Sequence, residues 1–254
     1  MILALDCGNS RIKIGLHGDA GWISQQSVAL DDGPALDAAM ASMLGKAGAA
    51  GGAPTMRAMA CNVAGAAVQA RVQDLLARHG LAARWLLPSR AEEGVTNHYE
   101  QPERLGADRW AALVGARGLH AGAAVVACAG TALTIDTLTD RGDFIGGVIL
   151  PGIALMKRSL AEGTAQLPLA HGRYSTTARN TQDAIESGVL DAACGAIARH
   201  AARVPGARVL LTGGDAGAIA AAWRADAAPE SGAAIALPLV VDNLVLEGLV
   251  RVAG

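Results

Sequence analysis

Apolar and polar positions follow one another along this chain in lengths that predict strands and helices in mixed order. Residues 2–5 (Ile-Leu-Ala-Leu) form an apolar run of strand length, and residues 11–16 alternate polar and apolar side chains, which is typical of a half-buried strand. Residues 6–10 (Asp-Cys-Gly-Asn-Ser) have turn chemistry. The opening unit is therefore strand, tight turn and strand, rather than strand, glycine loop and helix.

Two predicted helices flank a predicted strand in the first half, and a third helix follows. Apolar residues at helical spacing cover 35–44 and 68–79, and residues 56–63 predict the strand between them. Small residues at 45–54 predict a loop, and residues 107–119 predict the third helix.

The opening pattern returns about half a chain later. An apolar strand at 124–128 precedes a Gly130-Thr131 turn and an alternating strand at 133–138. Shifting the sequence by 122 positions places Gly8 on Gly130 (130 − 8 = 122), with an alternating strand after each turn. Such a repeat is what a duplicated two-lobe fold would show.

The remaining pattern completes a mixed α/β chain with antiparallel hairpins. We expect the lobes at residues 1–118 and 119–254, each with a phosphate-binding turn. Further strands are predicted at 144–150, 209–212 and 239–241, and further helices at 153–160, 181–200 and 244–252.

Composition narrows the class of protein. With 254 residues, 52% of them hydrophobic and 17% charged, the chain can bury a sizeable core and is not disordered. A net charge of −2 argues against a nucleic-acid partner. The uncharged stretch 118–135 has short apolar runs and predicts a buried strand rather than a membrane span, and no targeting segment is visible. We therefore expect a cytoplasmic protein with no membrane partner.

Familiar site motifs are missing from the sequence. There is no GxxxxGK[ST], GxGxxG after a strand, HExxH or GxSxG, which excludes the nucleotide, zinc and serine-hydrolase sites that those motifs build. The cysteines are far apart and lack metal-ligand spacing, so free thiols in a reducing compartment are expected. They are Cys7, Cys61, Cys128 and Cys194.

The first turn has residues that suit a phosphate site. Gly8 permits a tight turn, while Asn9 and Ser10 present donors beside exposed backbone N–H groups. Lys13 adds a positive charge, and Asp6 can hold Mg²⁺ through water. The alternative is an ordinary hairpin whose Asp caps its own turn.

Two other clusters carry candidate chemistry. The Gly130-Thr131 turn with Asp136 mirrors the first turn, and two such turns facing each other would clamp a nucleotide. Asp108 and Arg109 stand at a predicted helix start, where an Asp commonly caps the orphan N–H groups. The functional alternative is a carboxylate that accepts a hydroxyl proton beside a guanidinium that holds an anion.

Taken together, these motifs resemble those of type III pantothenate kinases, including members once described as Bvg accessory factors. The resemblance rests on residues 6–13 (DxGNSxxK), 106–109 (GADR) and 130–136 (GTAxTxD). Residues 146–152 (GGxIxPG) and 180–188 fit the same family, in the same order. It implies an actin/hexokinase/Hsp70-like α/β fold with two related ribonuclease-H-like lobes and mixed sheets, in a homodimer. It also implies ATP-dependent phosphorylation of pantothenate to 4′-phosphopantothenate, the first step of coenzyme A biosynthesis (EC 2.7.1.33).

The resemblance also assigns roles to individual residues. Asp108 would be the general base that takes the proton of the pantothenate primary hydroxyl, Asp6 would lie near Mg²⁺, and Thr181 would reach across from the partner subunit. ATP phosphates would be bound by Asp6, Cys7, Gly8, Asn9, Ser10, Arg11, Ile12 and Lys13, and by Thr131 from the second lobe. Pantothenate would be bound by Tyr99, Gly106, Ala107, Asp108, Arg109 and Thr181.

One position departs from the family pattern. Many members have an Asp two residues before the Gly-Thr turn, where it binds an activating K⁺ or NH₄⁺ ion, and this chain has Cys128 there. A neutral thiol is a poor ligand for cations that prefer oxygen. We therefore predict weak or absent activation by K⁺.

Two other functions remain open at this point. The chain could be a non-catalytic regulatory protein on the same fold, or a kinase of another small hydroxyl compound. The presence of Asp6, Asp108, Arg109 and Thr131 argues against a decayed enzyme.

Overall fold

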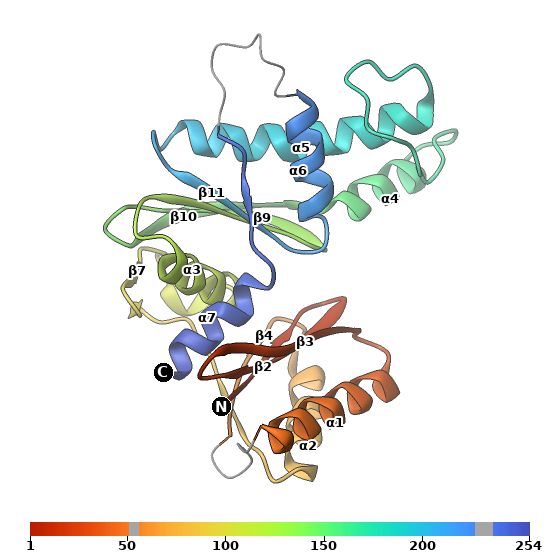
Figure 1. Ribbon diagram of the computed structural model, residues 1–254. Coiled ribbons are helices and arrows are strands. Elements are labelled where there is room, and N and C mark those ends of the chain that lie inside the picture. The colour runs from red at the N-terminus through yellow and green to blue at the C-terminus, as the bar shows by residue number, and fades with distance from the viewer. Residues whose placement is uncertain (51–55, 227–235) are drawn as a thin grey trace. The chain divides into compact units, whose positions relative to one another are not determined.

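The computed structural model describes residues 1–50, 56–226 and 236–254, which form two compact units (Figure 1). Unit 1 comprises Met1–Leu119 and Asn243–Gly254, and unit 2 comprises His120–Asp242. Each unit is built around one mixed sheet, so each can be described from its own strands outward.

Unit 1 contains a sheet in the strand order β3-β2-β1-β4-β5. Its first three strands run antiparallel to their neighbours, whereas β4 and β5 continue the sheet in parallel with β1. The strands are β1 (Ile2–Cys7), β2 (Arg11–Gly18), β3 (Gly21–Ala29), β4 (Arg57–Asn62) and β5 (Ala83–Trp85). The helices of this unit are α1 (Gly33–Ala49), α2 (Ala66–Arg78), α3 (Ala107–Leu119) and α7 (Leu244–Ala253). A small hairpin of β6 (Ala91–Glu92) and β7 (Val95–Asn97) and the 3₁₀ turn η2 (Pro102–Arg104) precede α3.

Unit 2 repeats this design. Its five strands follow the order β10-β9-β8-β11-β12, again with two antiparallel pairs followed by two parallel ones. The strands are β8 (Ala124–Ala129), β9 (Ala132–Leu138), β10 (Asp143–Pro151), β11 (Arg208–Thr212) and β12 (Leu239–Val240). Helices α4 (Ile153–Gly163) and α5 (Thr181–Ala202) lie between β10 and β11, and α6 (Ala216–Asp226) lies between β11 and β12. Strand by strand, β8 to β12 therefore correspond to β1 to β5, and the duplication inferred from the two turns is confirmed.

Alternation along the strands decides which side chains form the core of unit 1. One face of its sheet is packed by α1 and α2 and the opposite face by α7 (Figure 1). Because successive strand residues point to opposite faces, every second residue of β1 and β2 enters the α1–α2 core. These residues are Leu3, Leu5, Cys7, Ile12, Ile14 and Leu16.

The C-terminal helix, α7, belongs to unit 1 and not to the lobe in which the sequence analysis placed it. Residues 119–254 were expected to form the second lobe, but α7 packs with unit 1. The backbones of α7 and α3 are in contact: a Cβ on Gly248 would lie 1.8 Å from the Ala111 carbonyl oxygen, and one on Gly115 would lie 2.5 Å from that of Leu244. Glycine permits this approach, which no local pattern in the sequence indicates.

Some predicted elements also need correction. The loop expected at 45–54 is wrong for its first half, because α1 continues to Ala49, and residues 51–55 lie outside the described part. Strand β3 and helix α6 were not predicted. Almost every residue of β3 is half-buried, so its side chains do not alternate cleanly between polar and apolar. In α6, alanine and glycine make up seven of the eleven residues, and its two charged residues, Arg224 and Asp226, lie in the last turn, so no polar face is visible in the sequence. Within the described ranges, no helix is long and apolar enough to cross a membrane.

Candidate active site

The first turn joins β1 to β2 and has the geometry of a tight hairpin. The backbone N–H of Gly8 donates to the carbonyl of Arg11 at 3.0 Å, and the carbonyl of Ser10 accepts from the N–H of Leu30 at 3.0 Å. Asn9 and Ser10 are exposed at its tip. The turn is therefore braced from β3 as well as from within, and its tip faces solvent.

Strand alternation sorts the eight predicted phosphate-loop residues into different environments. Cys7 and Ile12 point into the α1–α2 core, so only their backbone can serve a ligand. Arg11 is directed along the sheet, where its Nε donates to Ser27 Oγ at 2.7 Å. Asp6 and Lys13 lie opposite each other across β1 and β2, on the face away from that core. The side-chain chemistry of the loop thus reduces to these two charged groups and the turn tip.

Asp6 has a second neighbour that sequence reasoning missed. Cys61 on β4 is its partner in the parallel register, and the Cys61 thiol donates to Asp6 Oδ1 at 3.5 Å. A row of ammonium, carboxylate and thiol therefore crosses three strands, from Lys13 through Asp6 to Cys61. The sequence contains no signal for it, because the pairing of β1 with β4 depends on a crossover through α1.

Burial sets the electrostatics of this row. Desolvation raises the pKa of Asp6 to about 6, against the opposing effect of Lys13 and with a further increase from the Asp108 carboxylate. Desolvation also raises the pKa of the Cys7 thiol to about 12. Cys7 and Cys61 are both free, buried and protonated at neutral pH, so neither is a reactive thiolate.

Asp108 lies in the first turn of α3, as predicted. Its Oδ1 accepts from the backbone N–H of the next residue, Arg109, at 2.8 Å, whereas a helix cap would accept from an N–H two or three residues further on. A Cβ on Gly106 would lie 2.7 Å from this oxygen, so the glycine leaves room for the carboxylate. Desolvation raises the pKa of Asp108, and the contacts with Arg109 oppose that increase. The Asp108 carboxylate is therefore oriented by the backbone of its own neighbour.

Arg109 and Tyr99 form the second part of this cluster. Arg109 is only 5% exposed, its Nη1 donates to the Tyr99 hydroxyl at 3.2 Å, and its guanidinium carbon lies 5.6 Å from the centroid of the Tyr99 ring. Tyr99 comes from the loop after β7, and that loop is held by Asn97, a residue that the sequence analysis did not select. Unit 1 thus brings together Asp6, Lys13 and Asp108, and joins Tyr99 to Arg109.

The second turn, between β8 and β9 in unit 2, is built from glycine contacts. The N–H of Gly130 donates to the carbonyl of Ala132 at 3.0 Å, and the N–H of Gly152 donates to that of Thr131 at 3.0 Å. A Cβ on Gly152 would lie 2.0 Å from the Gly130 carbonyl oxygen, and one on Gly213 would lie 2.2 Å from that of Ala129. Two segments far away in the sequence therefore hold this turn, with Thr131 exposed at its tip.

Asp136, the predicted counterpart of the first acidic group, is completely buried in β9. Its register partner on β10 is Gly147, where a Cβ would lie 2.1 Å from Asp136 Oδ1. Gly147, from the GGxIxPG motif at residues 146–152, therefore leaves space for this carboxylate. Cys128 lies at the end of β8 and is half-buried, with Thr134 of β9 as its register partner.

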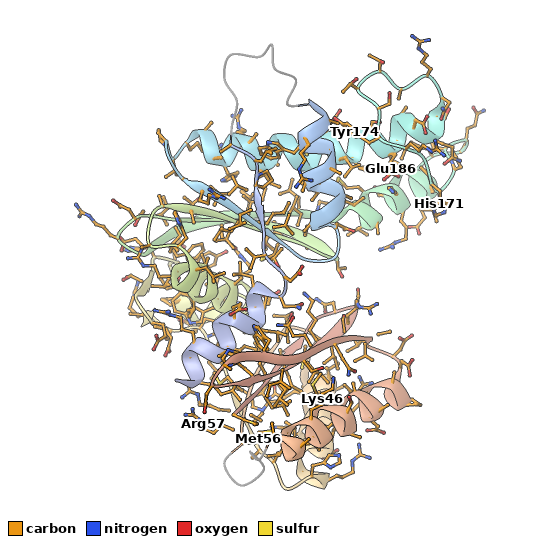
Figure 2. The ribbon with its side chains drawn as sticks, viewed as in Figure 1. Lys46, Met56, Arg57, His171, Tyr174 and Glu186 are labelled. Carbon is orange, nitrogen blue, oxygen red and sulfur yellow. The ribbon has the colours of Figure 1, made fainter. Side chains whose placement is uncertain are left out.

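A charged group lies beside the second turn. Lys157 of α4 forms an ion pair with Glu186 of α5, labelled in Figure 2, and both side chains are largely buried. The backbone N–H of Asp215 donates to the Ala129 carbonyl at 3.2 Å. Desolvation raises the pKa of Asp215, with Lys157 lowering it and Glu186 raising it. The charges of Lys157 and Glu186 therefore act on Asp215, which directly follows the Gly213-Gly214 turn.

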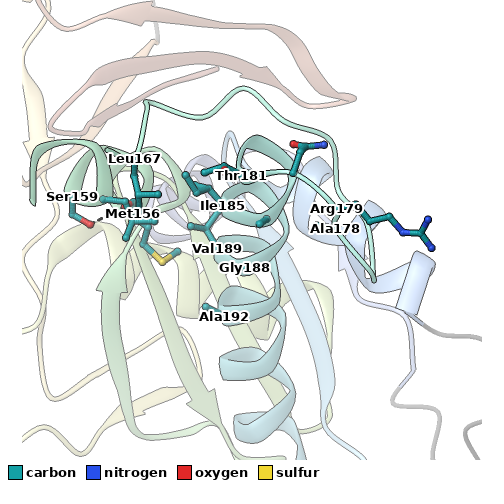
Figure 3. A pocket seen from close by; sticks show the side chains of 13 residues that line it. Met156, Ser159, Leu167, Ala178, Arg179, Thr181, Ile185, Gly188, Val189 and Ala192 are labelled. Atoms are coloured by element: carbon teal, nitrogen blue, oxygen red, sulfur yellow. Dashed lines mark hydrogen bonds between the residues drawn. The ribbon is translucent and has the colours of Figure 1, made fainter. Parts of the chain in front are cut away.

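Thr181 is the first residue of α5 and lies on the wall of a cavity of about 860 Å³ (Figure 3). The walls are α4, α5 and the segment between them, and most of the lining is apolar, including Met156, Leu160 and Ile185. Asn180 caps α5, with its Oδ1 accepting from the N–H of Asp183 at 2.9 Å. The structure thus places Thr181 in unit 2, on a different element from Thr131.

The segment before Thr181 is bound to α5 by side-chain acceptors on one face of that helix. The backbone N–H of Arg173 donates to Asp183 at 2.8 Å and that of Ser175 donates to Ser187 at 2.9 Å. The hydroxyl of Tyr174, labelled in Figure 2, donates to Asp191 at 2.9 Å. These contacts order the approach to Thr181.

Comparisons with known proteins identify the family of this chain. A family description, "Type III pantothenate kinase", matches residues 2–203. The chain is 45% identical over 257 residues to a type III pantothenate kinase of Aromatoleum aromaticum, covering 100% of this chain and 98% of the relative.

Solved structures support the fold. A putative 2-dehydro-3-deoxygalactonokinase of Sinorhizobium meliloti is similar with a TM-score of 0.62 and 16% identity, covering 100% of this chain and 98% of that one. A putative Baf family transcriptional activator of Campylobacter jejuni has a TM-score of 0.59 and 20% identity, with 98% and 96% covered. Together with the same order of five strands in each unit, these likenesses confirm the predicted actin/hexokinase/Hsp70-like fold.

Proposed function

The chain belongs to the type III pantothenate kinase family, and from that premise we propose which residues carry its reaction. The enzyme transfers a phosphoryl group from ATP to pantothenate in coenzyme A biosynthesis. Phosphoryl transfer needs little covalent chemistry from the protein, so the residues act by aligning the two substrates and offsetting phosphate charge.

Asp108 is the general base. The observation that carries this assignment is a half-buried carboxylate at the start of α3, given room by Gly106 and oriented by the N–H of Arg109. Burial raises its pKa, which makes the ionised carboxylate more basic and better able to accept the hydroxyl proton of pantothenate. Asp108 accepts this proton as the hydroxyl oxygen bonds to the γ-phosphorus of ATP, while the bond from that phosphorus to the β,γ-bridging oxygen breaks and ADP leaves.

Arg109 and Tyr99 bind the acceptor. A guanidinium presents paired donors that match a carboxylate, and pantothenate has one carboxylate. Arg109 is already fixed in place by the Tyr99 hydroxyl and ring, so little side-chain entropy is lost on binding. Gly106 and Ala107 are proposed to line this site beside Arg109, and Thr181 is proposed to complete it from the partner subunit.

The two turns bind the phosphates of ATP. The exposed tip of residues 8–10 offers backbone and side-chain donors, Lys13 supplies a positive charge, and Thr131 is the corresponding contact on unit 2. Asp6 fits a role near Mg²⁺, because it is a buried carboxylate whose charge Lys13 offsets only in part. When bound, the cation supplies charge neutralisation on the transferred phosphoryl group.

The test of this function is ADP release with ATP, Mg²⁺ and pantothenate, comparing wild type with Asp108→Asn. We expect turnover that requires pantothenate and falls about 10²–10⁴-fold in the variant, with ATP affinity retained. Pantothenate binding without turnover in the wild type would instead support the regulatory alternative. Turnover with other alcohols but not pantothenate would support a different acceptor.

We also propose that K⁺ activates this enzyme weakly or not at all. Cys128 provides a thiol at the position where many family members have a carboxylate, and the thiol is a poor oxygen substitute. Rates in Na⁺ and K⁺ buffers of equal ionic strength should agree within about twofold, because this chain lacks the carboxylate ligand for the cation. A many-fold increase in K⁺ or NH₄⁺ would contradict it.

The proposed homodimer uses the α4–α5 face. An apolar cavity beside Thr181 is the kind of surface that a second copy would cover, which is how Thr181 would reach a partner's pantothenate. Gly188 lines this cavity, and Gly195 lies outside it on the same helix; a Cβ would meet nothing within 4 Å at either position. We expect Gly188→Arg to give monomers in light scattering and Gly195→Arg to stay dimeric. A dimer in both variants would place the interface elsewhere.

The cytoplasmic location stays a prediction.

A further inference from the structure

Asn97 is a buried amide that the reaction scheme does not use. It ends β7, is completely buried, and engages every hydrogen-bonding group of its side chain. Its Nδ2 donates to the carbonyls of Ser89 at 3.1 Å and Pro102 at 3.2 Å, and its Oδ1 accepts from the N–H of Tyr99 at 3.0 Å. One side chain therefore ties together three separate points of the backbone.

The position of Asn97 follows from the hairpin before it. Glu93 and Gly94 both have positive φ, +47° and +78°, in a two-residue connection between β6 and β7, which is the geometry that brings two short strands together. The return strand places Asn97 beside Arg90, and the two residues exchange hydrogen bonds: Asn97 N–H to the Arg90 carbonyl at 2.8 Å, and Arg90 Nη1 to the Asn97 carbonyl at 3.2 Å. Backbone and side chain of Asn97 are thus both fixed.

The loop from 98 to 102 begins and ends on this amide. Its first contact is the N–H of Tyr99 and its last is the carbonyl of Pro102, so the loop cannot move at either end without breaking a buried hydrogen bond. Tyr99 in turn holds Arg109 through its hydroxyl and ring. A chain of contacts therefore runs from Asn97 through Tyr99 to the guanidinium.

We infer that Asn97 is a positioning residue for pantothenate: it sets the backbone of Tyr99, and through Tyr99 the direction of Arg109 toward the carboxylate of the acceptor. This inference rests on the proposed roles of Tyr99 and Arg109 in acceptor binding. Asn97 itself touches no substrate. It affects the affinity for pantothenate and does not affect the affinity for ATP.

The experiment is a double-mutant cycle of Asn97→Ala and Tyr99→Ala, read as KM for pantothenate, KM for ATP and kcat. We expect Asn97→Ala to raise the pantothenate KM about tenfold, which corresponds to the net contribution of one or two hydrogen bonds. We expect kcat and the ATP KM to change by less than about twofold. In the Tyr99→Ala background the second substitution should add less than about twofold, because both act through the same side chain.

Asn62→Ala is a matched control in the same unit. Its amide also bridges a turn, donating to the Gly65 carbonyl at 2.9 Å and accepting from the N–H of Ala64 at 3.0 Å. It should lower stability without changing the pantothenate KM. If Asn97→Ala does not fold, Asn97→Leu provides the comparison, because it fills the site with a neutral branched side chain and loses the acceptor for Tyr99 and both donors.

The outcomes distinguish a failure of this inference from a failure of the proposed pantothenate contacts of Tyr99 and Arg109. An unchanged pantothenate KM in Tyr99→Ala would overturn the acceptor contact and the inference with it. A raised KM in Tyr99→Ala together with an unchanged one in both Asn97 variants would overturn the inference alone. Additive effects in the cycle, or an equal rise in Asn62→Ala, would also overturn it, since the effect would then be general loss of structure.

Discussion

The hairpin turns at residues 8–10 and 130–131 occupy equivalent places in two sets of five strands with the same order, but their surroundings differ. Each turn has one hydrogen bond within it and one from the residue that follows the third strand, and the first turn lies beside the charged row of Lys13 and Asp6. The second is also enclosed by the backbones of Gly152 and Gly213, which directly follow β10 and β11. The same topology therefore places one turn beside charged side chains and the other against closely packed backbone.

This difference predicts which glycines each turn can lose. A Cβ on Gly8 would lie 3.2 Å from the Arg11 carbonyl oxygen, a contact that a small shift relieves. Cβ atoms on Gly152 or Gly213 would overlap backbone that cannot move without displacing the turn. Substitutions at the two turns should therefore differ sharply in their effect on stability.

The largest effect is expected for Gly213→Ala. Gly213 has φ +104°, and its new Cβ would lie 2.2 Å from the Ala129 carbonyl oxygen, so strain and overlap add. We expect the free energy of unfolding to fall by about 2–5 kcal/mol, measured by urea denaturation. Gly214→Ala is the control, because its Cβ would meet nothing within 4 Å. Equal losses in the two variants would show that the second turn is not held by this contact.

The next effect has the opposite sign and belongs to the charged row. The folded pKa of Asp6 is about 6 against an ordinary 3.8, so the folded state binds more protons between these values and its stability falls as pH rises through them. Asp6→Asn removes this dependence. We expect it to raise the free energy of unfolding by about 3 kcal/mol at pH 8, and by almost nothing below pH of about 4.

The measurement is chemical denaturation of both proteins across this pH range in EDTA. Turnover should be lost in Asp6→Asn while stability is gained, which would mark Asp6 as a residue kept for function. A difference that grows as the pH falls would contradict the assignment of the buried charge.

The smallest effect is expected for Gly8→Ala. The overlap with Arg11 is slight and the backbone of Gly8 does not have positive φ, so the loss of stability should be below about 1 kcal/mol. Thermal denaturation beside Gly152→Ala, whose Cβ would lie 2.0 Å from the Gly130 carbonyl oxygen, measures the contrast directly. Similar losses at the two glycines would remove the distinction between the turns.

Much of the fold could be predicted because its signals are local. The alternation at 11–16 and 133–138 and the small-polar turns before them were enough to infer two hairpins and their duplication. The helix at 107–119 was predicted with the bounds that α3 has. The membership of α7 in unit 1 was not predictable, since it depends on glycines of two helices meeting face to face.

The site divides in the same way. Asp6, Lys13 and Asp108 were found from the chemistry of their motifs, and the structure brings them into one unit. Cys61 and Asn97 were missed, because a thiol or an amide takes part only through the strand register or loop that places it beside Asp6 or Tyr99. No residue type or spacing along the chain distinguishes these two from ordinary core or turn residues.

The sequence by itself determined the turn chemistry, the strand faces and the family, because these depend on side-chain type and on short periods of two or 3.6 residues. Tertiary structure alone decided which carboxylates lose their water, which glycines meet a distant backbone, and which amide holds the loop of Tyr99. Desolvation and close packing are properties of all the neighbours of an atom, and most of those neighbours are far away along the chain.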